Sequence, residues 1–143
     1  MPSKRRNEKI DALQQVPLFS GLTVRQLEGI TPFVDEVDVE AGQVLIDEEG
    51  FGQELLIVVD GTAEVTRDGK HLANLGAGEA IGEIALLDGK PRTATVTATE
   101  PMTLLTISKR AFDTVLDRVP GLPHALLRTL ATRLREANLA RHS

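Results

Sequence analysis

Apolar positions divide the chain into a helical start, a middle punctuated by glycine, and a helical end. The first helical pattern begins near Asn7, a candidate N-cap, and ends at Pro17. Its apolar residues are Ile10, Leu13 and Val16. A second helix is predicted after Thr23, because Thr23 and Gln26 have the spacing of a capping box, and Pro32 ends it. We therefore expect two short helices before residue 34, and a frayed, polar stretch over residues 1–8.

From residue 34 to residue 108 the pattern changes to short apolar runs separated by glycine and acidic residues. The run Leu55–Val59 ends at Asp60-Gly61, and the alternating segment after it ends at Asp68-Gly69. Asp-Gly pairs are typical of two-residue turns between paired strands, so both pairs predict hairpins. Short strands at this spacing indicate a β-sandwich or a barrel.

After Ser108, a candidate N-cap, the helical period returns. One helix is predicted up to Pro120-Gly121, and a last helix from about Leu122 to the end of the chain. The last helix carries an apolar stripe of Leu127, Leu130 and Leu134. We expect this stripe to pack on the chain's own β unit. With Ala137 the same residues also fit a short coiled-coil seam, so a homodimer through this helix stays open.

Length and composition narrow the class of protein. The 143 residues suit one domain, with N-terminal helices over 7–33, a β unit over 34–108 and C-terminal helices over 109–141. A net charge of -5 argues against non-specific binding to nucleic acid. The absence of cysteine excludes disulfides and thiolate metal sites. No apolar run is long enough to span a bilayer, so we expect no membrane partner.

Residues 82–95 break the strand pattern and carry the candidate chemistry. Glu83–Leu87 are good helix formers, and the unpaired N–H groups at the start of a short helix favour an anion. Gly82 lets an anion approach the backbone, and the guanidinium of Arg92 matches two phosphate oxygens. Glu83 would repel a phosphate, but it can accept a hydrogen bond from a nearby hydroxyl. A phosphate beside a sugar hydroxyl describes a nucleotide.

The motif Gly-Glu-x-Ala-Leu-Leu at 82–87, followed by Pro-Arg-Thr-Ala-Thr at 91–95, resembles the phosphate-binding cassette of cyclic nucleotide-binding domains. The resemblance runs from the Val16-Pro17-Leu18-Phe19 turn to the last helix. It implies a mainly β fold, an eight-stranded double-sheet jelly roll with N-terminal helices and two C-terminal helices. It also implies a cytoplasmic, bacterial regulatory domain that binds a cyclic nucleotide without catalysis and signals by movement of its C-terminal helix.

The resemblance also assigns roles to cassette residues. Arg92 would bind the cyclic phosphate, and Glu83 would accept a hydrogen bond from the ribose 2′-hydroxyl. Backbone N–H groups of Ala85, Thr93 and Ala94 would point at phosphate oxygens. The full set of expected ligand-binding residues is Gly82, Glu83, Ile84, Ala85, Arg92, Thr93, Ala94, Val65, Leu72, Ala73 and Asn138.

The purine environment is expected on two strands and the last helix. Val65, Leu72 and Ala73 would form the wall of the base pocket, and Asn138 would hydrogen-bond a purine edge. Stacking by an arginine of the last helix, Arg133 or Arg135, is an alternative. Thr93 follows the key arginine, a choice associated with cGMP in kinases and channels. Many bacterial members with this residue type are read as cAMP receptors, so we expect cAMP and keep cGMP open.

Three other functions stay open. One alternative is a degenerate module that binds protein and no nucleotide. Another is a fragment of a larger cAMP-dependent regulator, since no DNA-binding domain follows the last helix. A jelly-roll enzyme is disfavoured, because no nucleophile triad or paired carboxylates can be assembled from the motifs. His71, His124 and His142 are isolated in the sequence, so we expect no metal site. A protein partner or a second copy on the C-terminal helix would receive the signal.

Overall fold

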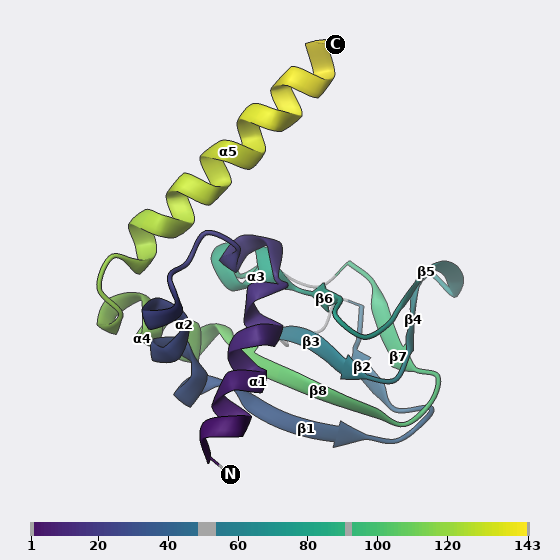
Figure 1. Cartoon of the computed structure of the whole chain (residues 1–143). Helices are drawn as coiled ribbons and strands as arrows, with labels where there is room; N and C mark the ends of the chain where they lie inside the picture. The colour runs from purple at the N-terminus through teal and green to yellow at the C-terminus, as the bar shows by residue number, and fades with distance from the viewer. Residues whose placement is uncertain (1, 49–53, 91–92, 143) are drawn as a thin grey trace.

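The computed structural model describes residues 2–48, 54–90 and 93–142, which form two four-stranded antiparallel sheets with helices gathered at one end (Figure 1). The helices are α1 (Pro2–Gln14), η1 (Pro17–Phe19), α2 (Val24–Ile30), η2 (Thr31–Phe33), α3 (Glu83–Asp88), α4 (Lys109–Arg118) and α5 (Leu122–His142). The strands are β1 (Asp35–Val39), β2 (Val44–Ile46), β3 (Glu54–Asp60), β4 (Ala63–Arg67), β5 (Lys70–Leu75), β6 (Ala80–Ile81), β7 (Thr95–Ala98) and β8 (Met102–Ser108).

The two sheets have the strand orders β1-β8-β3-β6 and β2-β7-β4-β5. Most neighbours in these sheets are distant in sequence, as in a double-sheet jelly roll, so the predicted fold class is confirmed. Among the described strands, only β4 and β5 are joined directly as a hairpin within one sheet. Apolar side chains between the sheets form one core cluster, and those between the first sheet and the helices form another.

The N-terminal helices agree with the sequence in one case and differ in the other. At Thr23 the capping box is complete, because its hydroxyl accepts from the Gln26 N–H at 3.1 Å and its own N–H donates to the Gln26 amide at 3.0 Å. The expected start at Asn7 is wrong, since α1 begins at Pro2 and Asn7 lies inside it. Proline suits the first turn of a helix, and lysine and arginine are good helix formers, so an earlier start is favoured.

The two Asp-Gly pairs have different roles. Asp68-Gly69 connects the paired strands β4 and β5, and both residues have positive φ, at 52° and 77°, as a primed hairpin turn requires. The hairpin predicted at Asp60-Gly61 is wrong, because β3 and β4 belong to different sheets. Gly61 has φ 94°, and a Cβ there would lie 2.5 Å from the Pro101 carbonyl oxygen. This glycine therefore makes a tight crossing between the sheets.

Helix α5 is anchored at its start and exposed beyond it. Leu122, Ala125 and Leu126 are buried, whereas Leu127 and Leu134 are 62% and 64% exposed. Figure 1 shows α5 leaving the helical end and pointing away from both sheets. The expectation that the leucine stripe packs on the β unit is therefore wrong for these two residues. None of the described helices is both long and apolar enough to cross a bilayer.

Candidate functional site

The candidate site is built around the start of α3. Gly82 is the residue before the helix and has φ 95°, which favours glycine. The first helical hydrogen bond runs from the Leu86 N–H to the Gly82 carbonyl at 3.3 Å. The N–H groups of residues 83–85 therefore have no acceptor inside the helix. Leu86 is 1% exposed and fixes α3 to the core, so this helix end has a defined position.

A cavity of about 430 Å³ opens at this end of α3. Six of the expected ligand-binding residues line it: Gly82, Glu83, Ile84, Ala85, Thr93 and Ala94. The other lining residues are Ile46, Ala80, Ile81, Asp88 and Lys90. The structure thus brings the two halves of the cassette motif to one concave surface. Arg92, the expected phosphate ligand, lies outside the described residues.

Glu83 contacts the N-terminal turn and α5. Its Oε2 accepts from the Leu18 N–H at 2.9 Å, and Arg133 Nη1 donates to its Oε1 at 3.5 Å. The Glu83 side chain is 18% exposed and that of Arg133 is 42% exposed. One carboxylate of the cassette therefore contacts both η1 and α5, a position that the sequence did not indicate.

The second half of the cassette is held by the hairpin of β4 and β5. Arg67 Nε donates to the Thr93 carbonyl at 2.9 Å. Glu48 Oε1 accepts from the Asp68 N–H at 3.0 Å and from the Thr95 hydroxyl at 3.3 Å. The sequence analysis missed Arg67 and Glu48, although Arg67 shares a strand face with Val65, two residues earlier, which could have drawn attention to it.

The residues expected at the purine lie in three places. Val65 on β4 and Ala73 on β5 are register partners. The next pair is Thr66 with His71, so Leu72 is an extra residue of β5 at this point. Val65 is 7% exposed and Leu72 is 50% exposed. None of these three lines the cavity at α3. Asn138 is exposed on the distal part of α5, so its purine contact stays a prediction.

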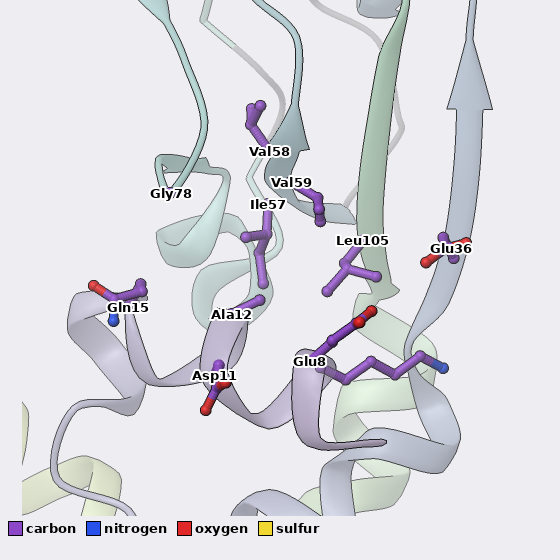
Figure 2. A pocket seen from close by; sticks show the side chains of 11 residues that line it. Glu8, Asp11, Ala12, Gln15, Glu36, Ile57, Val58, Val59, Gly78 and Leu105 are labelled. Atoms are coloured by element: carbon purple, nitrogen blue, oxygen red, sulfur yellow. The ribbon is translucent and has the colours of Figure 1, made fainter. Parts of the chain in front are cut away.

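A second groove lies between α1 and the sheet of β1, β8 and β3, and it shares no residue with the cavity at α3. Its volume is about 260 Å³. Figure 2 shows Ile57 and Leu105 facing α1 in this groove, with Glu8, Asp11 and Glu36 around it. Three carboxylates outnumber the one ammonium group in its lining, that of Lys9, so the groove disfavours an anion and is not the candidate phosphate site.

Metal-ligating side chains do not cluster in the part of the chain that the structure describes. No three histidine, aspartate or glutamate residues there are grouped closely enough to hold an ion. His71 instead pairs with Glu64, with 2.7 Å between Nδ1 and Oε2 on neighbouring strands. Among the described residues, the site therefore offers backbone N–H groups, apolar side chains and the polar side chains of Glu83, Asp88, Lys90 and Thr93.

The fold and the cassette geometry together define a ligand-binding jelly roll of the cyclic nucleotide type. The family model for the cyclic nucleotide-binding domain matches residues 36–119. The chain belongs to this family.

Relatives support the assignment at the level of sequence and structure. The cyclic AMP receptor protein of Thermus thermophilus is 32% identical over 128 residues, which cover 86% of this chain and 59% of that protein. A cAMP-dependent protein kinase regulatory subunit of Schizosaccharomyces pombe is 33% identical over 105 residues, which cover 73% of this chain and 26% of the subunit. The chain therefore spans 59% or less of these two relatives.

Among solved structures, the N-terminal domain of a transcriptional regulator from Streptomyces coelicolor is similar, with a TM-score of 0.84 and 35% identity. The match covers 91% of this chain and 96% of that domain. The jelly roll with flanking helices is thus shared between this chain and a bacterial regulatory domain.

Proposed function

We propose that this chain is a cytoplasmic cAMP receptor domain that binds its ligand without catalysis and signals through α5. The observation that carries the proposal is the cavity at α3, where both halves of the cassette motif converge. Its volume of about 430 Å³ falls within the range of small-molecule sites. The names of the receptor protein and the kinase subunit among the relatives favour cAMP.

The phosphate would bind at the start of α3. The N–H groups of Glu83, Ile84 and Ala85 have no acceptor in the helix, and Gly82 presents no side chain that would block an anion. The Ala94 N–H and the Arg92 guanidinium are assigned to the same phosphate by the family motif. A cyclic phosphate has one negative charge and two exocyclic oxygens, which a guanidinium can bind in a bidentate manner.

The nucleoside would extend from the phosphate over apolar side chains. Ile84 and Leu72 are each 50% exposed. A purine packed against them would remove apolar surface from water, which is favourable. The ribose 2′-hydroxyl would donate to Glu83. That carboxylate already contacts Leu18 and Arg133, so ribose would compete with α5 for the same oxygens.

This competition supports a role for α5 in signalling. Ligand at Glu83 weakens the Arg133 contact and shifts the position of the helix relative to the cassette. The exposed Leu127 and Leu134, seven residues apart on one side of α5, then offer an apolar face to a protein partner or to a second copy of the chain. Asn138, on the same part of α5, is assigned to the purine edge in the closed position.

Substitution of Arg92 tests the phosphate site. Arg92→Ala is expected to weaken cAMP binding by at least about 100-fold, the loss of a charge-assisted bidentate contact, while Arg92→Lys retains part of the affinity. Arg110→Ala, on the surface of α4, is the matched control. Unchanged cAMP affinity in folded Arg92→Ala protein would remove the phosphate assignment.

A protein-interaction module that binds no nucleotide is the second candidate. The observation that favours it is the engagement of Glu83 by the Leu18 N–H, which is a purely structural role for the cassette carboxylate. Equilibrium dialysis with labelled cAMP separates the two candidates, because a degenerate module retains no nucleotide at any concentration that saturates a receptor.

A further inference from the structure

A residue outside the cassette motif, Arg67, contacts Thr93. Arg67 Nε donates to the Thr93 carbonyl at 2.9 Å, and Arg67 Nη2 lies 3.5 Å from the Thr93 hydroxyl oxygen. Nε and one terminal nitrogen lie on the same edge of a planar guanidinium, so both donors point in one direction. Arg67 therefore contacts both the backbone and the side chain of the same threonine.

The strand register explains why this contact forms. β4 pairs with β7, with Val65 opposite Val96 and Thr66 opposite Thr95. The next residue of β4, Arg67, consequently lies where the chain enters β7 from the cassette. Arg67 shares a strand face with Val65. Its side chain therefore reaches Thr93, a residue 26 positions later that lines the cavity at α3.

The contact changes what Thr93 can offer to a ligand. A hydroxyl has one hydrogen to donate and two lone pairs to accept with. Arg67 occupies one lone pair, and its positive charge repels a second donor that approaches the same oxygen. The Thr93 hydrogen must point away from the guanidinium. Thr93 thereby keeps its donor and one free lone pair, and it becomes a weaker acceptor beside the positive charge.

This property discriminates between the two purines. Guanine has an exocyclic amino group, which is a donor and needs an acceptor, whereas adenine has no amino group at that ring position. We propose that Arg67 is a specificity-determining residue. It keeps the Thr93 hydroxyl from accepting a hydrogen bond from the guanine amino group, and it so favours cAMP over cGMP. This inference rests on the proposed function, because it concerns the selectivity of the same site.

The test measures the ratio of the cGMP Kd to the cAMP Kd by calorimetry on the full chain. Arg67→Met should lower this ratio about fivefold, the equivalent of one neutral hydrogen bond. In a Thr93→Ala background the same substitution should change the ratio by less than about twofold, since its target hydroxyl is gone. Arg110→Met on α4 is the matched control and should leave the ratio unchanged.

The outcomes separate the two hypotheses. If the unaltered chain binds neither nucleotide, the proposed function fails and the selectivity role fails with it. If it binds and Arg67→Met leaves the ratio unchanged, only the role of Arg67 is overturned. If Arg67→Met does not fold, Arg67→Lys replaces it in the test. Arg67→Lys keeps the charge but loses the planar fork, and it should also lower the ratio.

A second readout needs no ligand. Amide hydrogen exchange of Thr93 and Ala94 in the nucleotide-free protein should be faster in Arg67→Met than in Arg110→Met, because the loop loses its contact with β4. Equal exchange in both variants would show that Arg67 does not hold Thr93 and would overturn the inference.

Discussion

The carboxylate of Glu83 accepts a hydrogen bond of 2.9 Å from the backbone N–H of Leu18, a residue 65 positions earlier in the chain. Leu18 is fully buried, and its N–H belongs to the first turn of η1. The start of the cassette helix is thus fastened directly to the N-terminal turn. The same carboxylate contacts Arg133 of α5 through its other oxygen. Any ligand that engages Glu83 therefore acts on both helical ends of the chain.

We expect Glu83→Leu to destabilise the fold by about 1–3 kcal/mol, because it leaves the Leu18 N–H without its acceptor in a buried place. Glu83→Gln keeps an amide oxygen at that position and should cost clearly less. Urea denaturation of both variants gives the comparison. Equal stability of the two variants would show that the Leu18 bond contributes nothing to the fold.

Gly61 and Gly42 form a matched pair of glycines with positive φ, at 94° and 88°. Alanine at Gly42 meets no atom within 4 Å, so Gly42→Ala should cost only the backbone strain of about 1 kcal/mol. Alanine at Gly61 would also clash with the Pro101 carbonyl oxygen and Met102, so about 3 kcal/mol or more is expected. Thermal unfolding of the two variants tests this. A Gly61→Ala variant as stable as Gly42→Ala would contradict the tight crossing.

Leu126 and Leu134 test the two parts of α5. Leu126 is 3% exposed, so Leu126→Gln should cost about 2–5 kcal/mol for a buried leucine replaced by a polar side chain. Leu134 is 64% exposed, and Leu134→Gln should stay within about 0.5 kcal/mol of the unaltered chain. Denaturant titrations of both variants decide the point. A large loss at Leu134 would mean that this part of α5 packs on the body or on a second copy.

Local sequence chemistry predicted the features that depend on neighbouring residues. The Thr23 capping box, the Asp68-Gly69 hairpin and the short helix after Gly82 all formed as expected. Each needs only residues within one turn of the chain, and their side-chain and backbone preferences act in the same direction.

Features that depend on long-range packing could not be predicted in this way. An Asp-Gly pair indicates a turn but does not say whether the next strand joins the same sheet, which is why Asp60-Gly61 was misread. A leucine stripe indicates an amphipathic helix but not what covers it, so the exposure of Leu134 was not foreseen. The contacts of Glu83 with Leu18 and of Arg67 with Thr93 follow from topology and register, which no local pattern contains.

The most direct test of the central claim is a calorimetric titration of the nucleotide-free chain with cAMP and, separately, with cGMP. The protein has no tryptophan or tyrosine, so purine absorbance shows beforehand whether a nucleotide has co-purified. A receptor domain predicts saturable one-to-one binding, tighter for cAMP than for cGMP. Absence of binding to either nucleotide by folded, nucleotide-free protein would contradict the account and leave the interaction module in its place.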